Sequence, residues 1–246
     1  MNKRFATLGL LAGLSALSTG ALAYQFEASG FYFDFDDLDD SALAVEGAYF
    51  FAPVDDEGIP RAEAAFLGQA SNIGLGFATV DEADEDILFL GGELYIQQFY
   101  AAAGLTRIEV GNTESDDLSL EVGFVPAKGL RLTAGYDNDD LLDLSRISLN
   151  AKMVRPLSGQ QAFNAEFTVG KTDDNEDTID YGLMGDFFIN HDLSFGLGYS
   201  DTDADNSNEA ITLRARWFLI PTLSLQLQYN AQDFNDFMVL GVTGRF

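Results

Sequence analysis

The chain has 246 residues, of which 40 are acidic and 13 basic, giving a formal net charge of −27. Such a charge disfavours nucleic acid and anionic lipid surfaces as partners. The absence of cysteine excludes disulfides, structural thiolate metal sites and a thiol nucleophile.

The N-terminus has the pattern of a secretory signal peptide. Lys3 and Arg4 precede the apolar run LGLLAGLSAL, and Ala21 and Ala23 stand at the positions that a signal peptidase inspects. The apolar run is shorter than the ~20 residues that a transmembrane helix needs. Residues 1–23 are therefore predicted to be removed. The mature chain then begins at Tyr24, with 11 basic and 40 acidic residues and a net charge of −29.

The rest of the chain is a succession of segments in which apolar and polar residues alternate. In residues 118–124, LSLEVGF, large apolar residues alternate with serine, glutamate and glycine. Period-two alternation predicts β-strands with one apolar and one polar face. Strands are predicted over 24–34, 42–52, 61–80, 87–96, 98–111, 118–126, 129–137, 143–155, 161–171, 178–189, 192–201, 208–220, 223–232 and 237–246. Within 61–80 the alternation changes phase, which leaves open a β-bulge in one long strand or a tight turn between two.

The connections between these segments are of two kinds that take turns along the chain. Odd-numbered connections are acidic, such as DFDDLDD, DEADED and DTDADNSNE, whereas even-numbered ones are short or rich in turn formers, such as PAKG and PLSGQ. An antiparallel meander therefore places the acidic loops at one end and the tight turns at the other. No linker interrupts the pattern, so residues 24–246 are predicted to form one domain.

The composition of the polar face decides between a soluble sandwich and a membrane barrel. That face carries charges of both signs, which fits a polar lumen with the apolar face turned to lipid. Two groups of aromatic residues fit the two interfaces of a bilayer. The sequence predicts an all-β fold, a transmembrane antiparallel up-and-down β-barrel of fourteen strands, with twelve as the alternative. A secreted acidic β-sandwich is the competing fold.

The opening YQFEASGFYFDFDD, the segment AEAAFLGQASNIGLGF and the alternating final strand that ends at Phe246 resemble the general porins of Gram-negative bacteria. The resemblance covers most of residues 24–246 and implies an outer-membrane barrel without cofactors. It also implies that the final strand is read by the barrel-assembly machinery, with Phe246, Val242 and Leu240 as the signal. Gly244 departs from that pattern, because an aromatic residue is common at its position.

Catalytic and metal sites are not expected. The only histidine, His191, lies in a predicted tight turn, which disfavours histidine-dependent hydrolysis and leaves a carboxylate pair as the remaining catalytic arrangement. Asp201, Asp203 and Asp205 match the first ligands of an EF-hand loop, but Asn206 and Thr212 stand where Gly and Glu are required. Loose collective binding of divalent cations by the loop carboxylates is the expectation, and no cofactor is predicted.

We expect function to reside in the lumen. The predicted pore-lining residues are Arg107, Arg131, Arg146, Lys152, Arg214, Arg216, Glu27, Glu46, Glu93, Glu121 and Glu166. The bases could form one wall that faces the acids, or the two could pair as salt bridges that hold the wall. No loop is long enough to fold deep into the bore, so the pore is expected to be open.

The sequence thus predicts a channel for passive diffusion of small hydrophilic solutes or ions across the outer membrane of a Gram-negative bacterium. The acidic loops predict a mild preference for cations. The alternative is a barrel without a channel that acts as a surface adhesin or scaffold. Expected partners are outer-membrane lipid and the assembly machinery, and the sequence leaves both a monomer and a homotrimer open.

Overall fold

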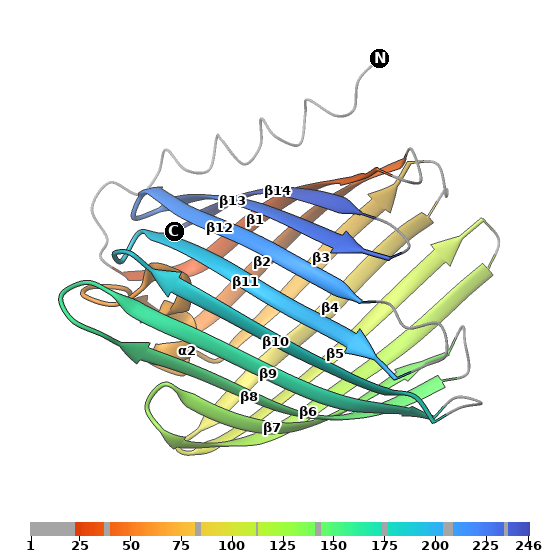
Figure 1. Ribbon diagram of the computed structural model, residues 1–246, viewed down its shortest axis with the longest axis horizontal. Helices are drawn as coiled ribbons and strands as arrows, with labels where there is room; N and C mark the ends of the chain where they lie inside the picture. The colour runs from red at the N-terminus through yellow and green to blue at the C-terminus, as the bar shows by residue number, and fades with distance from the viewer. Residues whose placement is uncertain are drawn as a thin grey trace.

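The structure, a computed structural model, describes residues 23–36, 40–81, 85–111, 113–140, 144–173, 177–203, 209–233 and 236–246. Residues 1–22 of the predicted signal peptide lie outside these ranges. Within them, fourteen antiparallel strands pair with their neighbours in chain order, and β1 pairs with β14, so that the sheet closes into a barrel (Figure 1). The prediction of a fourteen-stranded barrel is confirmed, and the twelve-stranded alternative is wrong.

The strands differ in length, and several extend past the bounds expected from alternation alone. Their bounds are β1 Ala23–Phe35, β2 Asp40–Asp55, β3 Asn72–Val80, β4 Glu85–Ile96, β5 Phe99–Val110, β6 Thr113–Ala127, β7 Leu130–Asp139, β8 Leu144–Pro156, β9 Ala162–Asp173, β10 Ile179–Phe188, β11 Leu193–Thr202, β12 Ala210–Ile220, β13 Leu223–Gln232 and β14 Phe237–Arg245. We call the end that carries the tight turns and the start of β1 the turn end, and the opposite end, which carries the acidic connections, the loop end.

The outer face of the barrel is apolar, as a bilayer requires. Every strand presents at least one large apolar side chain outward, and Leu75, Val122, Ile147 and Leu197 are each more than 60% exposed. A barrel with so much exposed apolar surface would aggregate in water, but the same surface suits contact with lipid. Aromatic side chains also point outward near both ends of the barrel, such as Phe51 near the turn end and Tyr32 near the loop end, whereas Tyr95 and Phe237 share the parity of the lumen-facing residues.

One connection departs from the predicted meander. The third predicted strand, 61–80, is wrong in its first half, because β3 begins only at Asn72. Residues 56–71, which we call the plug segment, instead contain a 3₁₀ turn, η2 (Arg61–Glu63), and a short helix, α2 (Ala64–Gly68). None of the helices in the described part of the chain is long and apolar enough to cross a bilayer.

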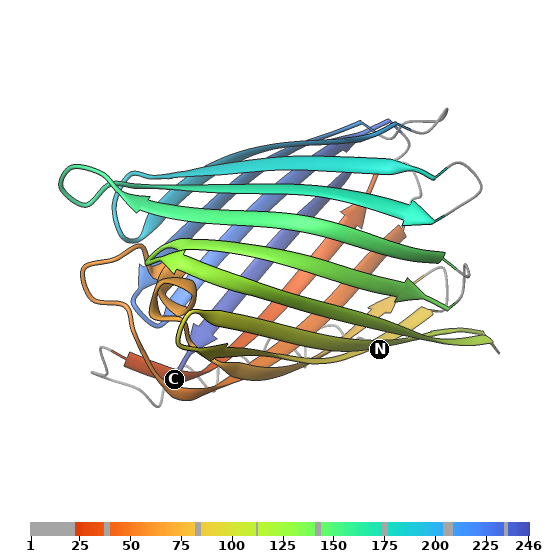
Figure 2. The ribbon, with the colours of Figure 1, turned by 90° about the horizontal axis from the view of Figure 1, so that it is seen from below.

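The plug segment lies inside the turn end of the barrel, where Figure 2 shows α2 enclosed by the strands. Tyr24, Phe50 and Val54 from β1 and β2 pack with Ala64 in a buried cluster. Val154, Phe188 and Phe218, lumen-facing residues near the turn ends of three other strands, are also almost completely buried. The expectation that no loop folds into the bore is therefore wrong, and the turn end has a packed core.

The barrel closes where the first strand meets the last. Glu27 pairs with Arg245, and the register continues to Phe35 opposite Phe237. Beyond the ladder, the backbone N–H of Phe246 donates to the carbonyl of Phe26 at 2.8 Å, and the Phe246 carbonyl accepts from Gln25 at 2.8 Å. These bonds satisfy backbone groups that would otherwise be unpaired at a sheet edge.

Candidate functional site

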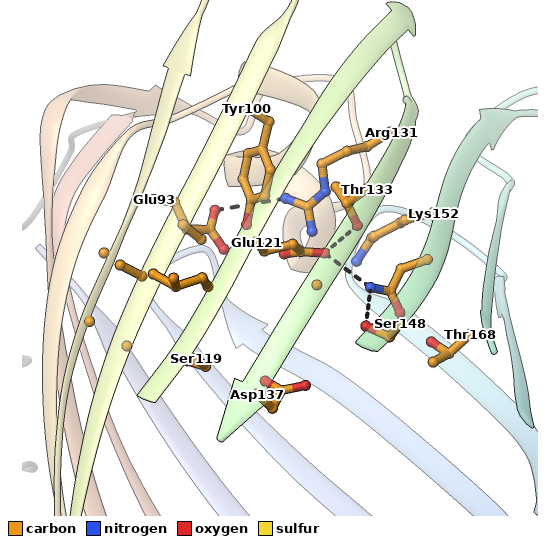
Figure 3. Close-up of a pocket in the computed structure, with 18 of the residues that line it drawn as sticks. Glu93, Tyr100, Ser119, Glu121, Arg131, Thr133, Asp137, Ser148, Lys152 and Thr168 are labelled. Carbon is orange, nitrogen blue, oxygen red and sulfur yellow. Dashed lines mark hydrogen bonds and ion pairs between the residues drawn. The ribbon is translucent and has the colours of Figure 1, made fainter. Parts of the chain in front are cut away.

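The lumen holds a cavity of about 650 Å³ against the wall built by β3 to β9 (Figure 3). Period-two alternation places polar side chains from each of these strands on the inner face. Six of the predicted pore-lining residues border it: Glu93, Glu121, Arg131, Arg146, Lys152 and Glu166. A second cavity of about 370 Å³ shares Ser119, Asp137 and Arg146 with the first and lies nearer the loop end. The described residues thus leave solvent space from the loop end to the middle of the barrel.

Two lumen arginines form bidentate ion pairs with carboxylates two strands away, both on β10. Arg146 binds Asp180 through two hydrogen bonds of 2.8 and 2.6 Å, and it also contacts Asp137 at 3.3 Å. Arg214 binds Asp186 in the same bidentate way, at 3.0 and 2.6 Å. Bidentate pairing fixes each guanidinium in one orientation. The predicted salt-bridge alternative therefore describes these bases.

Lys152 joins the wall to the plug segment. Its ammonium lies 3.0 Å from Glu63 of η2 and 3.2 Å from Glu166 of β9. It also stands 5.0 Å from the centroid of the Phe66 ring in α2. Burial raises the pKa of Glu63 above its ordinary value, although the Lys152 charge opposes the shift.

Arg131 and Arg216 are held mainly by neutral groups. Arg131 stacks over the Tyr100 ring at 4.1 Å, donates to the Tyr95 hydroxyl at 2.7 Å, and is 3.9 Å from Glu93. Arg216 donates to the side-chain carbonyl of Gln226. Stacking and hydrogen bonding keep both guanidinium groups against the wall.

The part of the lumen wall that β1 to β6 build is acidic. Glu27, Glu46, Glu93 and Glu121 share the lumen-facing parity of β1, β2, β4 and β6. Among the described residues of β1 to β6, no base faces the lumen. Glu27 is paired with Arg245 at 2.7 Å, whereas Glu121 accepts hydrogen bonds from the neutral groups of Thr133 and Asn150. The two walls differ in charge, as the first sequence alternative supposed, even though most bases have local partners.

Arg107 does not line the lumen, so that prediction is wrong. It alternates with lumen-facing Thr106 and shares the outward parity of Leu105, which is 54% exposed. Near the loop end of β5 it forms a bidentate pair with Asp116 of β6, at 2.7 and 2.9 Å. Both side chains are about half exposed, which fits a position beyond the apolar band.

The plug segment contributes site residues that the sequence prediction missed. Arg61 binds Asp56 at 2.7 Å and Asp192 of the β10–β11 turn at 2.6 Å, and its backbone N–H donates to the His191 carbonyl at 3.0 Å. Arg245 of β14 donates to the Arg61 carbonyl at 2.9 Å. The segment is therefore tied to the β10–β11 turn and to β14, in addition to the contact of Glu63 with Lys152 of β8. Pro60 followed by Ala- and Glu-rich residues was the available signal for a helix start.

The predicted assembly residues lie on the outer face of β14. Phe246, Val242 and Leu240 share one parity, and the Phe246 ring lies 6.1 Å from that of Phe26. A Cβ placed on Gly244 would come within 3.1 Å of the Phe246 ring. The ring thus covers the position where an aromatic residue is common, which accounts for the glycine.

The acidic loop that resembles an EF-hand is only partly described, because Asp205 and Asn206 lie outside the described ranges. Within those ranges, Asp203 accepts a hydrogen bond from the backbone N–H of Ile179 at 2.6 Å, and Asp201 accepts from the Tyr181 hydroxyl at 2.9 Å. No group of three or more His, Cys, Asp or Glu side chains in the described part of the chain is arranged to hold a metal ion.

A closed, even-stranded antiparallel barrel with an apolar exterior and a polar lumen defines a transmembrane barrel of the channel-forming class. Residues 3–135, more than half of the chain, match the sequence model of the family described as "Putative general bacterial porin". The chain belongs to this family of outer-membrane channels, and its surroundings are outer-membrane lipid.

Solved structures show the same fold. The Acinetobacter baumannii outer membrane protein Omp33 is 24% identical and superposes with a TM-score of 0.80 over 92% of this chain and 100% of that one. The KdgM porin in complex with disordered oligogalacturonate is 6% identical, with a TM-score of 0.51 over 89% and 99%. A triple mutant of Rhodopseudomonas blastica porin is 9% identical, with a TM-score of 0.51 over 91% and 99%. No curated protein sequence matches the chain.

Proposed function

We propose that the protein is a passive diffusion channel for small hydrophilic solutes in the outer membrane of a Gram-negative bacterium, with a mild preference for cations. The polar cavity of about 650 Å³ inside the closed barrel carries this proposal. Transport needs no covalent step, since the width and charge of the lumen set the rates. That the protein is not an enzyme stays a prediction.

The orientation that we propose places the loop end outside the cell and the turn end in the periplasm. Short turns face the periplasm in outer-membrane barrels, and longer loops face the exterior. The acidic connections then surround the outer mouth, where they raise the local cation concentration within a Debye length of ~8 Å at physiological salt. Loose binding of divalent cations by these loops belongs to the same proposal.

Liposome swelling with sugars of graded size tests passage, and reversal potentials across a salt gradient test selectivity. We expect swelling that falls with solute size and a cation preference that weakens as salt rises. Anion selectivity at low salt would contradict the charge argument. Absence of both swelling and channel steps from correctly folded protein would contradict the channel itself.

A barrel that acts as a surface scaffold or adhesin without conducting is the second candidate. The observation that favours it is the plug segment, which fills the turn end and is tied by ion pairs to Lys152 of β8 and to Asp192 of the β10–β11 turn. Single-channel recording of the wild-type protein separates the two functions. Steps that appear only when the plug segment is released would assign the resting state to a closed channel.

Other proposals concern biogenesis and assembly. Residues 1–23 are proposed as a signal peptide, and the outward-facing Phe246, Val242 and Leu240 as the segment read by the barrel-assembly machinery. A homotrimer is proposed as the assembled form. Fractionation, N-terminal sequencing of the mature protein and cross-linking in membranes test these three points in turn.

A further inference from the structure

An aromatic ring stands open in the middle of the lumen. Phe89 of β4 has the lumen-facing parity, yet it is 41% exposed. It borders the cavity of about 650 Å³ and also a smaller cavity of about 190 Å³ that lies toward β1 and β2. A large apolar side chain that faces water on the polar side of a barrel is not explained by packing or by lipid contact.

The Phe89 ring packs against the backbone at two glycines. Gly91 of β4 and Gly104 of β5 are directly paired across the two strands. A Cβ on Gly91 would lie 2.5 Å from Cζ of Phe89, and one on Gly104 would lie 3.1 Å from Cε2. Only glycine leaves this space, so the pair fixes the ring against the wall with its other side toward the cavity.

Carboxylates stand around the ring. Glu46 lies in the same cross-strand row, separated from Phe89 by Gly76, and its Cγ would be only 3.2 Å from a Cβ on that glycine. Glu93 and Glu121 flank Ala102 two rows further toward the turn end, beyond the row of Gly91 and Gly104 over which the Phe89 ring lies. Rows of one face are spaced by about 7 Å, so the tip of the ring and these carboxylates lie within reach of a single small solute.

The bases of the same cavity are already engaged. Arg146 has two carboxylate partners, Asp137 and Asp180, and Lys152 has two as well. Arg131 is stacked on Tyr100 and lies 3.9 Å from Glu93, so Glu93 has a base beside it. Glu121 accepts hydrogen bonds from neutral groups only, among the residues that the structure describes. The solvent-facing charge beside the ring is therefore negative.

We propose that Phe89 and the surrounding carboxylates Glu46, Glu93 and Glu121 form a binding site for small organic cations whose ammonium group carries apolar substituents. The ring face attracts the cation electrostatically and covers its methyl or methylene groups, while the carboxylates supply the opposite charge. This inference rests on the proposed channel function, for which it names a preferred class of solute.

The test compares choline with 3,3-dimethylbutan-1-ol, a neutral molecule of the same shape. Binding is measured by saturation-transfer NMR on the full-length protein in detergent, against empty micelles, because binding does not require conduction. We expect choline to bind several-fold more tightly than the alcohol. Equal affinity for the two, or no binding of either, would overturn the proposal.

Variants test the ring itself. Phe89→Leu keeps an apolar side chain without a π face and should weaken choline binding about fivefold. Gly104→Ala should displace the ring and have a similar effect. Gly182→Ala is its matched control, because a Cβ there meets nothing closer than 3.7 Å on the lumen wall. Choline binding that is the same in Phe89→Leu, Gly104→Ala and the wild type would overturn the role of the ring.

Glu121→Gln tests the charge, and we expect weaker choline binding with unchanged binding of the alcohol. A neutral sugar that binds in a Phe89-dependent way, without choline binding, would overturn the proposal in favour of an uncharged solute. Channel recordings on the same preparations separate the proposed channel function from the proposed binding site. Choline binding without conductance contradicts only the channel function, and conductance without choline binding contradicts only this inference.

Discussion

Replacing Arg61 by alanine should release the plug segment and open the turn end. The Arg61 side chain is only 17% exposed and binds two carboxylates, Asp56 and Asp192. Its loss leaves the Asp56 side chain, 5% exposed, without a cation. The backbone hydrogen bonds of residue 61 to His191 and Arg245 are retained in the variant, so the change isolates the charge.

The size of the effect follows from the burial of the pair. Removing one partner of a buried ion pair costs about 3–5 kcal/mol, because the remaining charge stays desolvated. Partial exposure of Asp192, at 45%, argues for the lower part of that range. Since 1.4 kcal/mol is a factor of ten, the ratio of undocked to docked plug segment should rise by roughly 100-fold.

Single-channel recording in planar bilayers, with liposome swelling in parallel, measures the change. We expect a higher open probability and faster swelling than in the wild type, with the same heat-modifiable migration that reports a folded barrel. Arg155→Ala is the matched control, because Arg155 is exposed on the outer parity near the turn end of β8. A folded Arg61→Ala protein that conducts like the wild type would refute the reasoning.

Three further changes have defined outcomes. Burial raises the pKa of Glu63 in the docked plug segment, so the docked state binds the Glu63 proton more tightly than the undocked state. Lowering the pH through the raised value toward the ordinary 4.5 should therefore favour docking and reduce the conductance. Glu63→Gln should flatten this pH profile in bilayer recordings. Arg214→Glu puts a second carboxylate beside Asp186, whose side chain is 4% exposed, and should lower the free energy of unfolding by about 3–5 kcal/mol; an unchanged urea midpoint in detergent would contradict this. Deleting Phe246 removes its backbone bonds to Phe26 and should reduce the protein recovered in outer-membrane fractions more than the conductance of the molecules that assemble, whereas wild-type recovery would argue against the assembly role.

The alternation of residue types was sufficient to predict the barrel because lipid and lumen impose opposite demands on neighbouring residues. Glu93 and Leu94, for example, are consecutive and take opposite faces, as the period of a strand requires. Alternation does not predict which face a residue takes where the strand extends beyond the lipid. Arg107 lies near the loop end, beyond the apolar band, where either face of the strand can carry a charge.

The plug segment could not be placed from sequence because its stabilising partners are distant in the chain. Arg61 and Asp192 are 131 residues apart, and Glu63 meets Lys152 of β8. A helix as short as α2 is marginal alone and depends on such tertiary contacts. The glycine pair against which Phe89 packs could not be predicted either, because only the register of β4 and β5 brings Gly91 opposite Gly104.

Arg245 couples the closure of the barrel to the docking of the plug segment. Its guanidinium donates to Glu27 of β1 at 2.7 Å and to the Arg61 carbonyl at 2.9 Å, and it stacks near the rings of Tyr24 and Phe218. Arg245 thus joins β14 to β1 and also holds the plug segment. Because one guanidinium makes both contacts, a change that separates β1 from β14 also removes an anchor of the plug segment.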